Sequence, residues 1–220
     1  EAMKRQDMAQ CCYDLKKIHL QGEDNPSTPV AQYDLGQLYL RGLGVPRDVT
    51  RTIELLNLSA RQKYAQAQFK LGSYYCEGLH VSKDVPRGVE LLTLAADQDH
   101  EGAQFLLGFM FRYGMQIPQD LQQGIRLLRR AAEQNHKRAQ HEMGLVYLMG
   151  DGMPQDAKRA VVFFMLAVKQ DYAKAQCALG CMYEKGVGVP RDVDKAAALL
   201  KRAVAQGDAK ATYMLGKMHL

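Results

Sequence analysis

The 220-residue chain has no tryptophan and no long hydrophobic run. A membrane-spanning helix needs roughly 18 or more consecutive apolar residues, and no stretch of the sequence approaches that length. No apolar stretch resembles the core of a secretion signal either. Hydrophobic residues nevertheless make up 47% of the chain and charged residues 24%, which is typical of a folded soluble protein. We therefore expect a substantial hydrophobic core and no membrane insertion.

Charge of one sign is not concentrated anywhere in the sequence. Lysine and arginine number 29 and aspartate and glutamate 24, for a formal net charge of +5, and no block of five like charges occurs. Basic pairs such as Arg129-Arg130 and Lys201-Arg202 are interleaved with acidic residues. This pattern indicates a solvated surface, so we expect no nucleic acid partner. A helical repeat that binds nucleic acid is the alternative that the basic net charge leaves open.

Sequence motifs of catalysis are also missing. The patterns Gly-x-Ser-x-Gly and Ser-x-x-Lys do not occur, and none of the four serines lies beside a plausible base. Gly42-Leu43-Gly44 and its copies lack the Gly-Lys-Ser or Gly-Lys-Thr of a phosphate-binding loop. We therefore expect a protein that is not an enzyme and has no catalytic residue.

Cysteine is scarce and its count is odd. The chain has five cysteines, and Cys177 and Cys181 lie four residues apart on one predicted helix. This arrangement suits reduced, packed thiols better than a disulfide framework, which favours an intracellular compartment. Two thiols supply only two of the four ligands of a structural zinc site, and His141 and the other histidines have no close ligand spacing. We expect neither a metal nor a cofactor.

What the sequence does contain is a repeat with a period of 36 residues. The pattern Ala-Gln-x-x-(Leu/Met)-Gly recurs at this spacing, followed each time by an aromatic residue, a glycine and an aspartate in constant phase. The alanines are Ala31, Ala67, Ala103, Ala139, Ala175 and, in a final variant, Ala211; the aromatic residues are Tyr39, Tyr75, Phe111, Tyr147 and Tyr183; the glycines are Gly42, Gly78, Gly114, Gly150 and Gly186; the aspartates are Asp48, Asp84, Asp120, Asp156 and Asp192.

Each repeat predicts two helices. Leu35 and Tyr39 belong to one buried helical stripe, and Gly42 follows where a left-handed residue ends a helix. Asp48 can then cap a second helix, whose apolar face includes Leu56. The position that follows the second helix holds Lys63, Asp99, Asn135, Asp171 and Gly207. All but Lys63 are residue types that tolerate a left-handed backbone.

Two antiparallel helices cannot cover their own apolar faces, so the repeats must stack to close a core. The predicted fold class is all-α, a right-handed α/α superhelix (solenoid) of 36-residue helix-turn-helix repeats. We assign residues 1–29 to an N-terminal capping helix with a polar loop and residues 30–220 to the solenoid. Its repeats are expected at about 31–66, 67–102, 103–138, 139–174 and 175–210, with a partial repeat at 211–220 that indicates a fragment of a longer protein.

The repeat resembles a known family. The segments Ala175-Gln176-Cys177-Ala178-Leu179-Gly180 and Gly186-Val187-Gly188-Val189-Pro190, followed by Asp192, are similar to the Sel-one-like repeat family, a relative of the tetratricopeptide repeat. The resemblance recurs five times over residues 31–220. It implies a scaffold or adaptor that binds proteins or peptides on the concave face of the superhelix.

The first helices carry an unusually apolar face opposite the predicted buried stripe. Aromatic residues and arginine are favoured anchors of protein interfaces, so we predict a partner-binding surface here. An alternative is that the aromatic residues at 33, 69, 105 and 213 pack between adjacent first helices, an explanation that accounts least well for Phe109 and Arg112. The predicted binding residues are Tyr33, Phe69, Phe105, Phe109, Arg112, His141, Leu145, Leu148 and Tyr213.

These features predict a non-catalytic scaffold or adaptor whose partner is a protein or a peptide. Self-association through the ends of the solenoid is a further expectation, because an uncovered terminal helix exposes an apolar face. The corresponding alternative function is a homo-oligomerising module of a larger signalling or stress-response protein.

Overall fold

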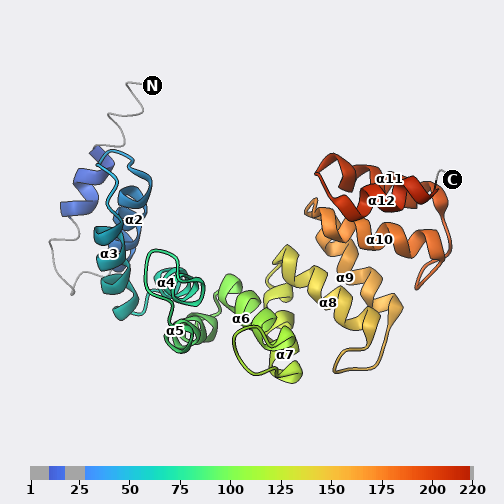
Figure 1. The fold of residues 1–220 in the computed structure, drawn as a ribbon, viewed down its shortest axis with the longest axis horizontal. Coiled ribbons are helices and arrows are strands. Elements are labelled where there is room, and N and C mark those ends of the chain that lie inside the picture. Colours follow the sequence, from blue (N-terminus) through green and yellow to red (C-terminus); the bar gives the residue numbers. More distant parts are fainter. Residues whose placement is uncertain (1–9, 18–27, 219–220) are drawn as a thin grey trace. The chain divides into compact units, whose positions relative to one another are not determined.

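A computed structural model describes residues 10–17 and 28–218, and all regular secondary structure within these two ranges is helical (Figure 1). A short helix covers residues 10–17. The longer helices that follow are α2 (Thr28–Arg41), α3 (Val49–Arg61), α4 (Ala65–Glu77), α5 (Val85–Asp97), α6 (Glu101–Tyr113), α7 (Leu121–Glu133), α8 (Lys137–Met149), α9 (Ala157–Lys169), α10 (Ala173–Lys185), α11 (Val193–Ala205) and α12 (Ala209–Met218).

The helices form consecutive pairs, α2/α3 to α10/α11, with one pair for each repeat, and α12 begins a further repeat. The chain gathers into two compact units that meet inside α6, between Leu107 and Gly108. Within the first unit α3 packs on both α2 and α4, and within the second α9 packs on both α8 and α10. The predicted all-α fold of stacked helix pairs is confirmed. None of the described helices is both long and apolar enough to cross a lipid bilayer.

Small residues let the two helices of a repeat approach closely. A Cβ atom on Gly72 of α4 would lie 2.9 Å from the carbonyl oxygen of Gly88 on α5, and one on Gly88 would also strike Cys76 Sγ. Any larger residue would push these helices apart. Close packing of the paired helices therefore explains the glycine at Gly72, Gly108, Gly144 and Gly180, whereas a Cβ atom on Gly36 would lie at an ordinary contact distance of 3.5 Å.

The predicted helix ends are confirmed. The glycines that follow the first helices have φ between 64° and 77°. The residues after the second helices are also left-handed, including Lys63 with φ 63°, so the position imposes this backbone on a residue type that disfavours it. His80 and Gln116 are left-handed as well, at the position that Gly44 holds in the first repeat.

A capping aspartate begins the second helix of each repeat. Asp48 accepts the backbone N–H of Arg51 at 2.9 Å, and the other four aspartates bond in the same way. The guanidinium of Arg51 also lies over the ring of Tyr39, with 5.5 Å between Cζ and the ring centroid. The aromatic residue of the repeat is thus covered by a cation from the start of the second helix. The repeated cation–ring pairs are Arg51–Tyr39, Arg87–Tyr75, Arg159–Tyr147 and Lys195–Tyr183.

A buried glutamine lies on the first helix of each of the five complete repeats, and Gln68 shows how it can connect neighbouring repeats. Gln68 of α4 is 2% exposed; its amide nitrogen donates to the Ala60 carbonyl of α3 at 3.2 Å, and its amide oxygen accepts from Gln98 after α5 at 2.6 Å. One side chain therefore bonds to the preceding repeat and to its own second helix. The equivalent glutamine pairs are Gln32–Gln62, Gln140–Gln170 and Gln176–Gln206.

The predicted N-terminal cap is described in part. The helix at residues 10–17 places Cys12 in a cluster with Leu35, Tyr39 and Leu55, and the Cys12 thiol donates to the Leu43 carbonyl at 3.4 Å. Residues 1–9 and 18–27, which include most of the predicted polar loop, lie outside the described residues. The division of the chain at residue 29 stays a prediction.

Replacement of a buried glutamine should destabilise the protein. We expect Gln140→Met, which keeps the volume of the side chain, to lower the free energy of unfolding by about 2 kcal/mol, because the Ala132 carbonyl loses a buried donor. Urea denaturation followed by circular dichroism measures this change. The control is Gln122→Met on α7, whose amide donates to the Gly152 carbonyl at an exposed site where water can replace it, so a change below about 0.5 kcal/mol is expected. Equal losses for the two variants would contradict a structural role for the buried amide.

Lys63 offers a stabilising substitution. Because glycine adopts a left-handed backbone without steric cost, Lys63→Gly should raise the free energy of unfolding by about 1 kcal/mol. Lys63→Ala keeps the Cβ atom and removes the same charge, so it should give no comparable gain in thermal unfolding. If alanine and glycine stabilise the protein equally, the left-handed backbone is not the cause.

Candidate functional site

Three of the predicted binding residues in the first compact unit pack within the protein. The Tyr33 ring meets the edge of the Tyr64 ring at a centroid distance of 5.6 Å, and Phe69 stacks on His100 at 4.5 Å. Phe105 is 5% exposed. The partners Tyr64 and His100 lie in the turns between repeats. Tyr33 and Phe69 therefore pack on the turn residues that precede the next first helix, and Phe105 is buried.

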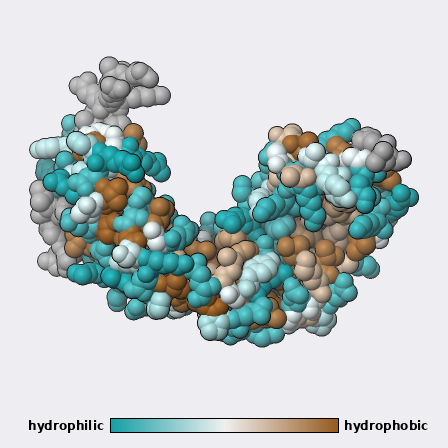
Figure 2. Space-filling view, in the orientation of Figure 1, coloured by the Kyte–Doolittle hydropathy of each residue, from teal (hydrophilic) through white to brown (hydrophobic). Residues whose placement is uncertain are grey.

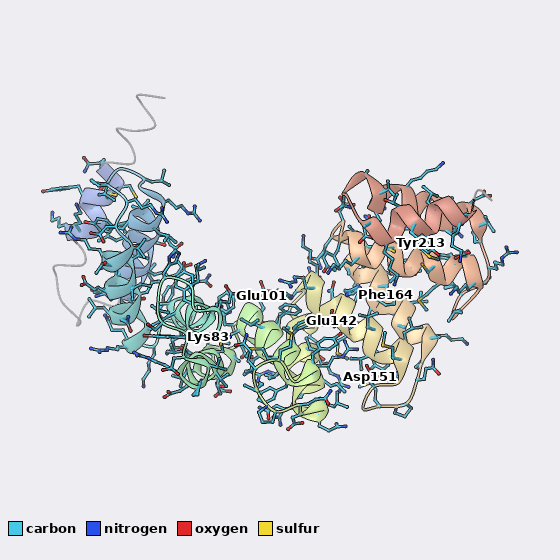
Figure 3. The ribbon with its side chains drawn as sticks, viewed as in Figure 1. Lys83, Glu101, Glu142, Asp151, Phe164 and Tyr213 are labelled. Carbon is cyan, nitrogen blue, oxygen red and sulfur yellow. The ribbon has the colours of Figure 1, made fainter. Side chains whose placement is uncertain are left out.

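Arg112 also lies inside the protein, in a charged cluster of the second compact unit. It is 2% exposed; its Nη1 donates to Glu142 Oε2 at 2.6 Å and its Nη2 to Asp151 Oδ2 at 2.9 Å. The Tyr113 hydroxyl donates to the same Glu142 oxygen at 2.8 Å, and His141 Nδ1 lies 3.4 Å from Glu142 Oε1. Figure 3 marks Glu142 on α8 and Asp151 in the loop after it. The cluster binds the end of α6 to α8.

The cluster holds charged and neutral groups in defined states. Burial raises the pKa of Glu142, but its contacts with His141 and Tyr113 and the charge of Arg112 outweigh this effect and hold the pKa below its ordinary value. Burial and the neighbouring carboxylate raise the pKa of Tyr113 to about 12. At neutral pH Glu142 is therefore an ionised acceptor, and the Tyr113 hydroxyl is a neutral donor.

Arg112 is thus a structural residue in this fold. The equivalent positions in the other four paired helices hold Leu40, Cys76, Leu148 and Glu184. A buried arginine that lost its partners would be costly, so the cluster specifies how the third and fourth repeats join. The sequence alone does not reveal this role, because Glu142 and Asp151 lie 30 and 39 residues further along the chain.

An exposed apolar surface lies on the same two helices. We define the α6/α8 patch as Phe109, Tyr113, Leu145, Leu148 and Met149. Tyr113 is 45% exposed and Met149 is 61% exposed, and Phe109 packs on Tyr113 with 4.6 Å between ring centroids. Phe109, Leu145 and Leu148 are half-buried. Figure 2 shows hydrophobic areas among hydrophilic side chains on this side of the protein.

Three members of the α6/α8 patch are among the binding residues predicted from the sequence, and two, Tyr113 and Met149, are not. Comparison of equivalent positions would have found them, since the other paired first helices carry Arg41, Glu77 and Lys185 there. Among the remaining predicted residues, His141 is buried at 8% exposure, and its ring lies 5.5 Å from that of Tyr172. Tyr213 is 65% exposed on α12.

The described residues offer other surface features. A pocket of about 530 Å³ in the first compact unit lies between α3, α4 and α5, with Arg61, Arg87, Leu91 and Leu94 in its lining. In the described ranges, histidine, cysteine, aspartate and glutamate side chains form no group of three or more suited to a metal ion. The five cysteines are free thiols.

Comparison with known proteins identifies the repeat. The model of the Sel1 repeat matches residues 29–64, 65–100, 102–136, 137–172 and 173–208, about two residues earlier than the repeats expected from the sequence. No curated protein matches the chain. Sel1 repeat proteins are in general scaffolds for protein interaction, and the family is typically non-catalytic.

Solved structures agree with this result. A Sel1 repeat protein from Oxalobacter formigenes is 30% identical, with a TM-score of 0.84 and coverage of 97% of this chain and 88% of that one. A protective antigen of uropathogenic Escherichia coli strains, with an SLR fold, is 26% identical with a TM-score of 0.69; the match covers 94% of this chain and 51% of the antigen. An immunity protein of Pseudomonas aeruginosa, 23% identical with a TM-score of 0.56 over 86% of this chain and 68% of that one, shares the fold alone. The chain belongs to the Sel1 repeat family.

Proposed function

We propose that this chain is a non-catalytic scaffold that binds an apolar segment of a partner protein on the α6/α8 patch. The observation that carries the proposal is the exposure of Tyr113 and Met149, at 45% and 61%, where other repeats place charged residues. Stacking of the repeats does not require apolar side chains at these positions, because the equivalent positions of three other repeats hold the charged residues Arg41, Glu77 and Lys185. An apolar patch that the fold does not need is a candidate for recognition.

The chemistry of the α6/α8 patch suits a protein partner. Tyrosine, phenylalanine and methionine are enriched in interfaces, and methionine adapts its shape to an apolar side chain. Tyr113 is held in place by its bond to Glu142, by the Phe109 ring and by Arg112, whose Cζ lies 4.8 Å from the Tyr113 ring centroid. A side chain that is already ordered loses little entropy on binding. In this proposal Arg112 acts as a positioning residue beneath the surface.

The other predicted residues have different places in this proposal. Leu145 and Leu148 are half-buried members of the α6/α8 patch, and His141 is buried beside Glu142. Tyr33, Phe69 and Phe105 belong to the first compact unit, where their packing already accounts for them. Tyr213, on α12, is exposed and stays a separate predicted contact.

Charge substitutions on the patch test the proposed function. The double variant Tyr113→Lys, Met149→Lys introduces the residue type that Lys185 already supplies in the fifth repeat. Because Tyr113 also donates to Glu142, thermal unfolding of the variant is compared with that of the wild type before binding is measured. We expect it to weaken partner binding at least about tenfold, because two apolar anchors are lost. Partners are identified by photo-cross-linking from a benzophenone side chain at position 149, and affinity is then measured with the purified partner. Leu94→Lys is the control, since Leu94 on α5 is 45% exposed, like Tyr113.

Each outcome of this experiment is decisive. A protein that cross-links at position 149 and binds the Leu94→Lys control normally but the double variant weakly supports the proposal. Equal binding by all three proteins would place the interface elsewhere. Light scattering distinguishes self-association, because a wild-type dimer that dissociates in the double variant would make a second copy of the chain the partner. Recovery of RNA alone would favour nucleic-acid binding instead.

A further inference from the structure

The pocket between α3, α4 and α5 is a groove with an apolar side and a cation at its start. We call it the α3/α5 groove, and its volume is about 530 Å³. Arg87, Leu91, Leu94 and Gln98 line it from α5, and their spacing of four, three and four residues places them on one face of that helix. Because an α-helix rises about 1.5 Å per residue, Arg87 and Gln98 are separated by about 16 Å along the groove.

Two more cations lie at the far end of the α3/α5 groove. Arg61 is the last residue of α3 and Lys63 follows shortly after it; both are exposed and both line the groove. The buried amide of Gln68 brings them close to the end of α5, because it donates to the Ala60 carbonyl at 3.2 Å and accepts from Gln98 at 2.6 Å. The groove therefore has cations at both ends and leucine side chains between them.

Lys63 stands where the backbone disfavours it. Its φ is 63°, a left-handed conformation that is costly for lysine. The equivalent positions hold Asp99, Asn135, Asp171 and Gly207, which are residue types that tolerate it. Strain that the fold does not need points to a function. A positive charge, which none of the four equivalent residues carries, is the property that distinguishes Lys63.

The end of α3 is basic, whereas the ends of the other second helices are not. The positions equivalent to Arg61 and Lys63 hold Asp97 and Asp99, Glu133 and Asn135, Lys169 and Asp171, and Ala205 and Gly207. The sum of the formal charges is positive for the pair at the end of α3 and zero or negative for each of the other pairs. This charge is therefore a property of one repeat and not of the fold.

The same place in the second compact unit is crossed by an ion pair. Arg202 of α11 and Asp171 after α9 are equivalent to Leu94 and Lys63, and the guanidinium donates to the carboxylate at 2.8 Å. Leu94 carries no charge, so this pair cannot form between α3 and α5. The space that the pair would cross belongs there to the groove, and a cation faces it from the end of α3.

We propose that the α3/α5 groove binds an extended acidic segment of a partner protein. An aliphatic side chain of the segment packs on Leu91 and Leu94, and a carboxylate lies at each end of the groove. Charge complementarity selects an acidic ligand, because three cations and one carboxylate, that of Asp97, line the groove. An extended chain advances about 3.3 Å per residue, so the two carboxylates belong to residues about five positions apart.

This inference does not depend on the proposed function. The α3/α5 groove and the α6/α8 patch have no residue in common, and they bind segments of different chemistry, one acidic and one apolar. Leu94→Lys therefore remains a control for the α6/α8 patch. The Lys63→Gly variant, in contrast, should be more stable than the wild type and bind the acidic segment more weakly.

Selection of short random peptides displayed on phage tests the α3/α5 groove, with the full-length chain as the target. We expect the enriched peptides to carry two acidic residues about five positions apart, with an aliphatic residue between them. A carbodiimide then joins any carboxylate of the bound peptide to an amine that it touches, and mass spectrometry should find this cross-link on Lys63. The control is a peptide of the same composition with its two acidic residues adjacent, which should bind more weakly.

Variants of the groove separate binding from stability. Arg61→Gln, Lys63→Asn removes two cations and places at position 63 the residue type of Asn135, which has the same left-handed backbone. It should bind the enriched peptide at least about tenfold more weakly and unfold at the same or a higher temperature. Lys83→Asn, which removes an exposed lysine before α5, is the control and should bind normally. Asp97→Asn should bind about threefold more tightly, because a repelling carboxylate is lost.

Several results would overturn the proposal. Failure to enrich any peptide, or enrichment of peptides without acidic residues, would show that the groove does not select this ligand. A cross-link found only on other lysines, or full affinity in the Arg61→Gln, Lys63→Asn variant, would place the peptide elsewhere. Equal losses in that variant and in Lys83→Asn would indicate non-specific attraction to positive charge. Peptides that only the Tyr113→Lys, Met149→Lys variant fails to bind would belong to the α6/α8 patch.

Discussion

A glutamine side chain buried between helices must have its amide donor and acceptor satisfied by protein, because water cannot reach it. In this structure Gln68 meets that requirement only when three helices are correctly placed: α3 supplies a carbonyl, α4 carries the amide, and the end of α5 supplies a second amide. Apolar packing would tolerate small slips between helices, whereas directional bonds do not. The repeated glutamine therefore fixes how one repeat stacks on the next.

Constant stacking gives equivalent positions equivalent environments, so departures from the pattern carry information. Tyr113 and Met149 stand out because charged residues fill the same place elsewhere. Arg112 stands out for the opposite reason, since it is a charged residue at a position that is mostly apolar in the other repeats. Its charge is neutralised by ion pairs with Glu142 and Asp151. The first departure is exposed and suits recognition. The second is buried and makes the third and fourth repeats join through ion pairs.

Much of the fold could be predicted because the interactions that begin and end its helices join residues close together in the sequence. Asp48 caps the helix that starts beside it, and the left-handed backbone at position 63 follows from the end of a helix two residues earlier. The site was harder to predict because the residues that contact each other there are distant in sequence. Helical periodicity identified Phe109, Leu145 and Leu148, but it could not show that Arg112 meets a carboxylate 30 residues away or that the rings at 33 and 69 are covered by turn residues.

The role of the buried glutamine is tested most directly by hydrogen exchange of the Gln68→Met variant, read by mass spectrometry. Since Gln68 bonds to α3 and to the residue that follows α5, the account predicts faster amide exchange at the ends of both helices as well as in α4. Faster exchange confined to α4 would mean that the glutamine serves only its own helix, and it would contradict the claim that this side chain sets the stacking of the repeats.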